Sequence, residues 1–402
     1  MNRNAIDSRS AGRRNENMVL AILRKHGSLS QSRICELTAL GSSTVSTIVS
    51  RLREKNLILE NRGQSGKRGA KPVLIRINPV GQYLLGAEIN PTVIRIGLFD
   101  FHCELADQIT IPLGADHSVD NVIRLLEINS RGLVSKENIP PEKIMGLGVT
   151  LSGSITPAGI VELSSPLGWK MVPLKQRLAE KFEWPVELYT TKVRLLAEIR
   201  TEPALSAKNI VYFNIADGVG STIISDGNLI YGATNRSGEL GHMIVQPDGP
   251  LCGCGHRGCL EALISGPALA KKIKADIAGG VQSVLSERTG ETMVPDEIIE
   301  QLAQAVNRQD PYALSVRDFI AEHLCRAASV AVNLFDPNVM ILAGYVSQPF
   351  LPCFKEKIRE HFAAQVYDSS SREIEILGAR TGKEALIRGV AAAVFQKAIA
   401  PG

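Results

Sequence analysis

The chain lacks any long apolar run. No stretch of its 402 residues approaches the roughly 18 consecutive apolar residues of a membrane-spanning helix, which excludes a membrane protein. The first 14 residues are polar, carry four arginines and contain no apolar core of a secretory signal. We therefore expect no signal peptide, no membrane partner and a cytoplasmic location.

Cysteine is also scarce. The chain has 7 cysteines, an odd number, and three of them lie close together. This usage favours a reducing compartment and a metal site over a disulfide framework. Hydrophobic residues make up 44% and charged residues 21%, which is ordinary for a globular protein and excludes collagen-like, disordered and small secreted classes. The length predicts two or three domains.

The charges are unevenly distributed. Residues 1–76 hold 15 Lys and Arg against 5 Asp and Glu, a net charge of +10, whereas the remainder holds 30 against 36, a net charge of −6. A basic segment joined to an acidic body indicates a nucleic-acid-binding module attached to another domain. A solvated basic tail is the alternative, and the pattern within the segment argues against it.

Residues 1–78 are predicted to form a winged helix-turn-helix domain. Apolar residues recur at helical spacing from Met18 to Leu23, and Ser30 is a suitable N-cap for a second helix. A third helix follows, and two strands, over 57–60 and 73–77, flank a basic loop that is rich in glycine. A three-helix protein-interaction domain is the alternative, but charge, helix spacing and basic loop together favour DNA binding.

The third predicted helix, capped by Ser42 or Ser43, has two different faces. One is an apolar stripe, and the other carries small hydroxyl residues, which are poor helix formers in solution. In a major groove, however, short side chains let a helix approach and reach phosphates and base edges, while a basic loop follows the backbone or enters a minor groove. The predicted DNA contacts are Ser43, Thr44, Ser46, Thr47 and Arg51 in the helix, and Lys67, Arg68 and Lys71 in the loop.

The acidic body alternates strands with helices, which is typical of an α/β fold. Strands are expected within 83–114, a helix over 118–133, and a buried strand within 144–153 that ends in a Gly-rich turn. A similar alternation restarts near Asn209, about 120 residues after the first strands of the body, so we expect two related lobes.

The strongest chemical signal is a cluster of cysteine and histidine within 18 residues. Cys252, Cys254 and Cys259 stand among glycines, with His242 and His256 nearby. Three thiolates and an imidazole match a tetrahedral zinc site, which four protein ligands would close and make structural. The alternative is three unrelated buried cysteines, but packing gives no reason for a Cys-x-Cys-x4-Cys cluster among glycines. On spacing alone, either histidine could be the fourth ligand.

These segments resemble the signature of the ROK family, named for repressors, open reading frames and kinases. The resemblance rests on Gly218-Val219-Gly220, Gly238-Glu239-Leu240-Gly241-His242, and the stretches 247–252 and 254–261, and it extends over essentially the whole chain. The winged helix ahead of them resembles the NagC/XylR and Mlc-type repressor branch. The resemblance implies an α/β body with a two-lobed, actin-like and hexokinase-like fold.

The resemblance also implies domain boundaries and site residues. The body would span 79–402, with a small lobe of 79–200 plus a C-terminal helix at about 383–398, and a large lobe of 201–382 that holds the zinc loop. One structural zinc per chain would be bound by His242, Cys252, Cys254 and Cys259. Glu239, His242 and Glu261 fall where the family contacts a sugar's hydroxyl groups. The alternative is that Glu239 and Glu261 only stiffen the zinc loop.

Two parts of a family kinase are missing. Kinases of the family begin the body with Asp-x-Gly-Gly-Thr, whose glycines let backbone N–H groups approach the phosphates of ATP. Here the stretch is Glu88-Ile89-Asn90-Pro91-Thr92, and Pro91 removes a donor. The family's Asn-Asp pair, which supplies a general base, is replaced by Tyr189-Thr190-Thr191-Lys192, without a carboxylate. We therefore expect no catalytic residues and no phosphoryl transfer.

The sequence thus predicts a transcriptional regulator, a repressor of carbohydrate-related genes, that binds a double-stranded DNA operator. A sugar or sugar phosphate would control it from a degenerate sugar-kinase cleft. The alternative is control by a regulatory protein without any sugar ligand, and a sugar kinase is the enzyme alternative. Because helix-turn-helix proteins bind paired half-sites as symmetric dimers, we expect a homodimer or homotetramer.

Overall fold

The computed structural model describes residues 8–62, 73–287, 293–382 and 384–399. These residues form two compact units. The first contains the described residues up to Ala197 and those from Gly382 onwards, and the second runs from Glu198 to Thr381. Within the described residues, no helix combines the length and the apolar character that crossing a membrane requires.

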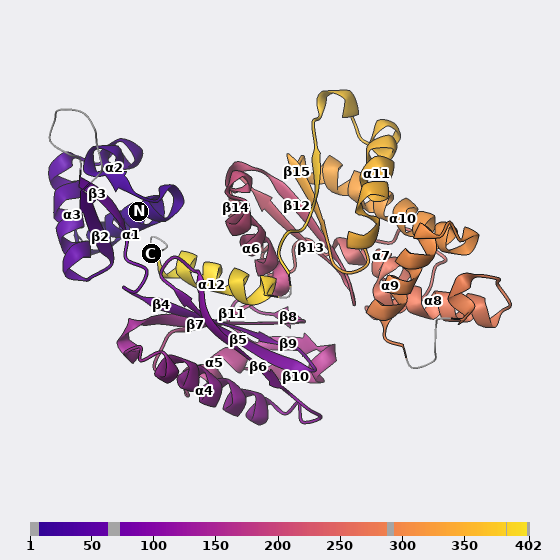
Figure 1. Cartoon of the computed structure of the whole chain (residues 1–402), viewed down its shortest axis with the longest axis horizontal. Helices are drawn as coiled ribbons and strands as arrows, with labels where there is room; N and C mark the ends of the chain where they lie inside the picture. Colours follow the sequence, from indigo (N-terminus) through magenta and orange to yellow (C-terminus); the bar gives the residue numbers. More distant parts are fainter. Residues whose placement is uncertain (1–7, 63–72, 288–292, 383, 400–402) are drawn as a thin grey trace, which may run out of the picture. The chain divides into compact units, whose positions relative to one another are not determined.

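The first unit opens with a small head of helices and a three-stranded sheet in the order β1-β3-β2 (Figure 1). Ser30 caps α2, because its hydroxyl accepts the N–H of Arg33 at 3.2 Å. The predicted serine cap of α3 is wrong: Gly41 already has the extended backbone of an N-cap, so the helix begins at Ser42. The elements are α1 (Ser8–His26), β1 (Leu29–Ser30), α2 (Gln31–Thr38), α3 (Ser42–Glu54), β2 (Ile58–Arg62) and β3 (Val73–Ile77).

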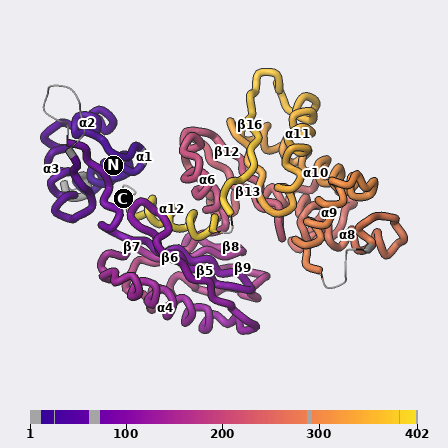
Figure 2. Tube along the Cα trace, in the orientation of Figure 1, coloured from indigo at the N-terminus to yellow at the C-terminus, as the bar shows by residue number. Residues whose placement is uncertain are grey.

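The rest of the first unit is a lobe built on a five-stranded sheet in the order β11-β7-β4-β5-β6. β4 pairs antiparallel with β5 and parallel with β7, and α4 and α12 cover opposite faces of the sheet (Figures 1 and 2). The elements are β4 (Tyr83–Ile89), β5 (Val93–Asp100), β6 (Leu105–Pro112), α4 (Val119–Lys136), β7 (Ile144–Leu151), β8 (Ser154–Ile155), β9 (Val161–Ser164), β10 (Trp169–Val172), α5 (Leu174–Ala179), β11 (Val186–Tyr189) and α12 (Ala385–Ala398). Helix α6 (Arg194–Thr201) begins in this unit and ends in the second.

The last helix, α12, packs on the strands that open this lobe, and glycine makes the close approach possible. A Cβ atom at Gly86 would lie 2.5 Å from the carbonyl oxygen of Ile387, and one at Gly148 would lie 2.3 Å from the side chain of Val390. Any larger residue at these two positions would push the helix off the sheet. At these two glycines the sheet has no side chains, so the apolar residues of α12 pack close to its backbone.

Helix α12 also contacts the head. The guanidinium group of Arg24 in α1 lies 4.0 Å from the ring centre of Phe395 in α12, a cation–π distance. Buried residues of the head, of α12 and of the aromatic pair Phe99 and Phe101 form one apolar cluster. Head and lobe therefore share a core within the first unit. That residues 1–78 form a domain of their own stays a prediction.

The second unit is built on another five-stranded sheet, in the order β14-β13-β12-β15-β16. β12 pairs antiparallel with β13 and parallel with β15, which repeats the arrangement around β4 in the first unit. The elements are β12 (Ile210–Ile215), β13 (Val219–Ser225), β14 (Asn228–Leu229), α7 (Leu260–Ile264), α8 (Gly266–Ala278), α9 (Pro295–Asn307), α10 (Pro311–Phe335), β15 (Val339–Ala343), α11 (Leu351–Gln365) and β16 (Glu375–Gly378).

Candidate functional site

Helix α3 presents a polar face to solvent, as a helix that enters a DNA groove requires. All five predicted DNA contacts on this helix are exposed: Ser43, Thr44, Ser46, Thr47 and Arg51. The predicted apolar stripe, Val45, Ile48, Val49 and Leu52, is buried against the rest of the head. The other three predicted contacts, Lys67, Arg68 and Lys71, lie outside the described residues.

A carboxylate that the sequence analysis missed lies beside this face. Glu16 of α1 accepts a hydrogen bond from Lys55 at 2.6 Å, and its other oxygen lies 3.8 Å from the guanidinium group of Arg51. An ion pair of that length with an exposed partner contributes little stability, so Arg51 stays available for a phosphate. Glu16 and Arg51 are distant in sequence, and only the packing of α1 against α3 shows that they are neighbours.

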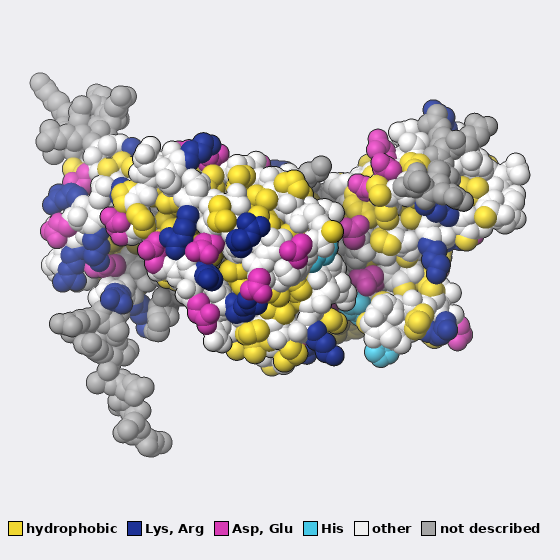
Figure 3. Space-filling view, turned by 90° about the horizontal axis from the view of Figure 1, so that it is seen from below, with side chains coloured by type: hydrophobic (Ala, Val, Ile, Leu, Met, Phe, Trp, Pro, Cys, Tyr) yellow, Lys and Arg dark blue, Asp and Glu magenta, His cyan; other side chains and the backbone are white. Residues whose placement is uncertain are grey.

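The lobe face that carries α4 has a different electrostatic character (Figure 3). Basic and acidic side chains alternate there: Arg131 lies 3.2 Å from Glu183, and Arg177 pairs with Asp120. A surface that follows a DNA backbone needs an excess of Lys and Arg, because each bound phosphate must be neutralised. Among the described residues drawn on this face, such an excess is absent.

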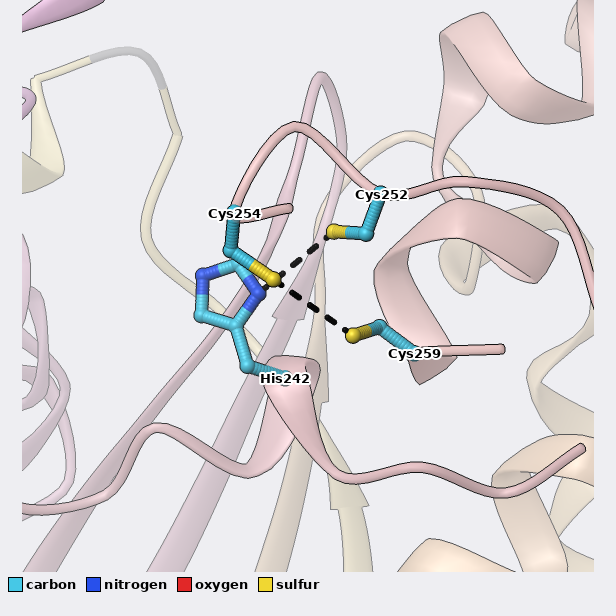
Figure 4. A group of neighbouring side chains, drawn as sticks. All are labelled: His242, Cys252, Cys254 and Cys259. Carbon is cyan, nitrogen blue, oxygen red and sulfur yellow. Dashed lines mark hydrogen bonds between the residues drawn. The ribbon is translucent and has the colours of Figure 1, made fainter. Parts of the chain in front are cut away.

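Four side chains of the second unit converge in the metal loop, residues 238–261 (Figure 4). His242 Nδ1 lies 3.7 Å from Cys252 Sγ, and Cys254 Sγ lies 3.6 Å from Cys259 Sγ. All four ligand atoms lie within 4.8 Å of one another. Sulfurs bound tetrahedrally at about 2.3 Å from an ion would be roughly 3.8 Å apart. The donor set therefore fits a tetrahedral metal ion.

The structure separates the two candidate histidines. His242 joins the three sulfurs, whereas His256 is outside this group and its Nδ1 lies 3.5 Å from Cys254 Sγ. Hydrogen bonds from His256 lower the pKa of the Cys254 thiol to about 6, which favours the thiolate that a metal binds. Burial raises the pKa of Cys259 to about 12 in the absence of an ion. A bound cation would lower this pKa and favour the thiolate of Cys259.

Two glycines give the metal loop its shape. A Cβ atom at Gly241 would lie 1.9 Å from the carbonyl oxygen of Val219, so only glycine lets His242 approach the start of β13. Gly258 has a φ of 72°, and a Cβ atom there would lie 1.5 Å from the carbonyl oxygen of Gln246. The glycines of the motif are thus required by close backbone contacts that position the ligands.

The two glutamates predicted to contact an effector have different surroundings. Glu261, at the start of α7, accepts the N–H of Val219 at 3.0 Å, and its other oxygen lies 3.9 Å from Cys252 Sγ. Glu239 is exposed and precedes the short helical turn of Leu240–His242. Glu261 therefore links the start of α7 to Val219 and lies beside Cys252, whereas an effector contact by Glu239, His242 and Glu261 stays a prediction.

The backbone N–H groups of the turn between β4 and β5 are hydrogen-bonded within the turn itself. The side-chain oxygen of Asn90 accepts the N–H of Thr92 at 3.1 Å, and the N–H of Asn90 donates to Val93 at 2.9 Å. Pro91 has no N–H to offer. Glu88, which precedes the turn, is buried and pairs with Arg95 at 2.9 Å. This turn therefore has no amide left for a phosphate within Asn90–Thr92.

Comparison with known proteins identifies the body and the head. The ROK family pattern matches residues 86–397, and a winged helix-turn-helix DNA-binding pattern matches residues 13–58. The chain belongs to the ROK family. The ROK family transcriptional regulator described as a homologue of Escherichia coli Mlc has a crystal structure that superposes with a TM-score of 0.84, at 23% identity over 97% of both chains. That likeness confirms the predicted fold, a winged helix followed by the two-lobed ROK body.

Curated ROK relatives include both regulators and enzymes. The xylose repressor of Caldicellulosiruptor bescii is 28% identical over 362 residues, which are 88% of this chain and 90% of the repressor. The glucokinase of Thermotoga maritima is 26% identical over 317 residues, which are 78% of this chain and 98% of the enzyme. Membership of the ROK family therefore does not by itself separate a repressor from a kinase.

Proposed function

We propose that this ROK protein is a DNA-binding transcriptional regulator that represses carbohydrate-related genes in the cytoplasm. The observation that carries the proposal is the exposed hydroxyl face of α3, in a winged helix head joined to a ROK body. Helix α3 lies in the major groove of the operator, where Ser43, Thr44, Ser46, Thr47 and Arg51 contact bases and phosphates. Lys67, Arg68 and Lys71 contact the backbone or the minor groove.

The regulator acts as a homodimer, or as a homotetramer made of two such dimers. One winged helix reads one half-site, and two heads related by a two-fold axis read a palindromic operator. A single head makes few phosphate contacts, so pairing two heads on one operator raises the affinity without any new kind of contact.

The metal of the loop is zinc, one per chain, bound by His242, Cys252, Cys254 and Cys259. Four protein ligands leave no open position, so the zinc is structural. When bound, it supplies the cation that keeps three thiolates together. The protein's own contribution is the glycine-rich backbone that brings the four ligand atoms within 4.8 Å.

The body no longer transfers phosphate and instead senses an effector. The glycine-free turn of Asn90–Thr92 uses its amides internally, and no carboxylate follows β11 at Thr190–Lys192. The effector is a sugar or a sugar phosphate whose hydroxyl groups contact Glu239, His242 and Glu261. Because His242 faces the sulfurs through Nδ1, its Nε2 remains for a ligand hydroxyl.

Control by a regulatory protein is the second candidate. It is favoured by the hydrogen bond between Glu261 and Val219, which takes one acceptor site of one of the three groups that a sugar would contact. Under this alternative the cleft is vestigial, and a partner protein shifts the two lobes instead of a small molecule.

Selection of genomic fragments by the purified protein, followed by footprinting, tests the DNA-binding function. We expect palindromic sites beside genes of carbohydrate uptake or metabolism, and no retardation of the same fragments by a chain that lacks residues 1–78. Retardation by that truncated chain would contradict the assignment to the head. Calorimetry with sugars and sugar phosphates distinguishes control by a small molecule from control by a regulatory protein. An assay with ATP and the same sugars should show no phosphorylation.

A further inference from the structure

Glu16 of α1 is a buried acidic residue beside the polar face of α3. It is 8% exposed, whereas the other acidic residues that the structure describes in the head, Glu36, Glu54 and Glu60, are exposed. A buried carboxylate loses its hydration, which costs folding free energy unless cations face it. The cations that face Glu16 belong to the end of α3, the helix proposed to read the operator.

The two oxygens of Glu16 face two different basic side chains. One oxygen lies 2.6 Å from the ammonium group of Lys55, which is a close ion pair, and the other lies 3.8 Å from the guanidinium group of Arg51, which is a loose one. The side chains of Lys55 and Arg51 are 54% and 55% exposed, whereas that of Glu16 is only 11% exposed. Each cation therefore contacts the carboxylate on its inner side and is open to solvent on its outer side.

Lys55 is a basic residue of α3 that the sequence analysis did not name as a DNA contact. It is the C-cap of the helix and follows Arg51 by four positions, so the two side chains lie one helical turn apart on the same side. A turn of helix rises about 5.4 Å. A DNA backbone that Arg51 contacts would therefore lie within reach of the ammonium group of Lys55.

Glu16 and a DNA phosphate compete for this ammonium group. In the close pair, the charge of Lys55 is neutralised within the protein. Arg51 differs, because a guanidinium group has five N–H donors and only a loose contact with Glu16 occupies it. The carboxylate also repels any phosphate that approaches the end of α3, and this repulsion does not depend on the base sequence.

We propose that Glu16 is an internal counter-charge of the head, which holds Lys55 away from the DNA backbone and lowers the affinity for DNA of every sequence. The proposal rests on the proposed function, because it concerns how the head binds DNA. Non-specific binding consists almost entirely of phosphate contacts, so the counter-charge keeps it weak. The operator is bound through base contacts as well, and these are not affected by Glu16.

Titration of DNA with full-length Glu16→Gln at several salt concentrations tests the proposal. Glutamine has nearly the same size as glutamate but no charge. Operator affinity should rise about three- to tenfold at low salt, and the slope of log affinity against log salt should steepen by about one unit, because Lys55 gains a phosphate. An unrelated duplex of equal length should gain by the same factor. Unchanged affinity and slope, or a gain for the operator alone, would overturn the proposal.

Two further variants identify the group through which Glu16 acts. In the double variant Glu16→Gln with Lys55→Ala, the salt slope should return to the wild-type value, and a slope that stays steep would contradict the role of Lys55. Glu127→Gln on α4 removes the same charge from a carboxylate that lies 3.8 Å from Arg131 of the lobe. It should change neither affinity nor slope, and a gain equal to that of Glu16→Gln would show a general effect of net charge instead.

Thermal unfolding separates the counter-charge from a purely structural role. Glu16→Met also removes the charge at similar size, so it should raise DNA affinity as Glu16→Gln does. If Glu16 only stabilised the head, both variants would melt at a lower temperature and bind the operator more weakly than wild type. That result would assign Glu16 to the folding of the head and overturn the proposal.

The wild-type protein separates this inference from the proposed function. If wild type binds the selected operator but both Glu16 variants bind it with wild-type affinity and slope, the regulator stands and the counter-charge is wrong. If wild type binds no DNA, the proposed function is wrong, and a Glu16→Gln protein that also binds none contradicts the counter-charge as well.

Discussion

Glu261 accepts the backbone N–H of Val219 at 3.0 Å, and its second oxygen lies 3.9 Å from the sulfur of Cys252. One carboxylate thus joins the start of α7, the turn between β12 and β13, and the metal loop. The residue that the family resemblance assigns to an effector is therefore also a structural part of the loop. An effector that contacts Glu261 would bind a carboxylate that already accepts the N–H of Val219.

This double role makes Glu261→Gln informative. The glutamine keeps an oxygen for the N–H of Val219 but loses the charge that accepts hydrogen bonds from a sugar's hydroxyl groups. We expect unchanged metal content and operator affinity, and a weaker effect of effector on operator binding, measured by titrating the protein–DNA complex with sugars and sugar phosphates. Glu239→Gln, at another residue of the predicted trio, should weaken the effect of the effector in the same way. A full effector response with a lowered melting temperature would instead assign Glu261 to loop stiffening alone.

The two histidines near the sulfurs should differ in metal binding. His242→Ala removes one of four ligands and should lose most of the metal, because the remaining three sulfurs leave the tetrahedron open. His256→Ala should retain about one zinc per chain, since His256 lies beside Cys254 without joining the group. Elemental analysis of the two purified variants makes the comparison, and the opposite pattern would reassign the fourth ligand.

Removal of the metal should lower the stability of the second unit. Cys259→Ser should lose zinc and destabilise the second unit, because ligand binding free energy at such a site is partly folding free energy. Cys325→Ser replaces another buried cysteine of the same unit, one outside the group of His242, Cys252, Cys254 and Cys259, and should retain the ion. Urea unfolding with and without a chelator measures both effects. A chelator that leaves the wild-type transition unmoved would show that the loop holds no structural metal.

Operator affinity should depend on Arg51. Its side chain is 55% exposed at the edge of the polar face of α3. Arg51→Ala should weaken operator binding by roughly 1–3 kcal/mol if it contacts a base, and should flatten the salt dependence by about one unit if it holds a phosphate. Arg131→Ala on α4 removes the same charge from the lobe and should change neither quantity. Equal losses in both variants would indicate a general charge effect.

Asp310 should make the second unit sensitive to acid. Burial raises the pKa of Asp310, but hydrogen bonds from the amides of Ala313 and Val284 and the hydroxyl of Ser283 outweigh it, so the pKa is lowered. A lowered pKa stabilises the folded state above the unfolded value of about 3.9, and this contribution is lost as the pH falls through the folded pKa.

Asp310→Asn tests this contribution. The variant should be less stable than wild type at pH 6 by about 1 kcal/mol, because asparagine can still cap α10 but loses the charge that strengthens the hydrogen bonds from Ser283, Val284 and Ala313. The difference in unfolding free energy should shrink as the pH is lowered below 4. A difference that stays constant between pH 6 and pH 3 would show that the charge of Asp310 adds nothing to its capping role.

The sequence was most informative where function depends on local spacing. The exposed and buried faces of α3 follow from helical periodicity, and three cysteines of the metal site lie within eight residues, so both could be predicted from adjacent residues. The choice of His242 over His256 could not be made on spacing. It depends on the close contact between Gly241 and the carbonyl group of Val219, which turns His242 toward the sulfurs.

Long-range contacts were beyond such reasoning. Glu16 beside Arg51, and Arg24 over Phe395, each join residues that no sequence period relates. The serine cap expected for α3 failed for a local reason, because Gly41 already supplies the extended backbone of an N-cap. At Asn90–Thr92 the sequence predicted only the loss of the family's glycines. The structure shows in addition that the amides of this turn are used in hydrogen bonds within the turn.

The packing of α12 on Gly86 and Gly148 has a consequence for how the chain is made. β4 leaves the ribosome roughly 300 residues before α12, which at 5–20 residues per second is about 15–60 s. Until then Gly86, Gly148 and the apolar side chains around Phe99 lack the cover that α12 provides. The first unit is therefore completed last, after the second unit has been synthesised. Nascent chains stalled before Ala385 would expose the first lobe to chaperones and proteases. Deletion of α12 would therefore destabilise strands that lie far before it in the sequence.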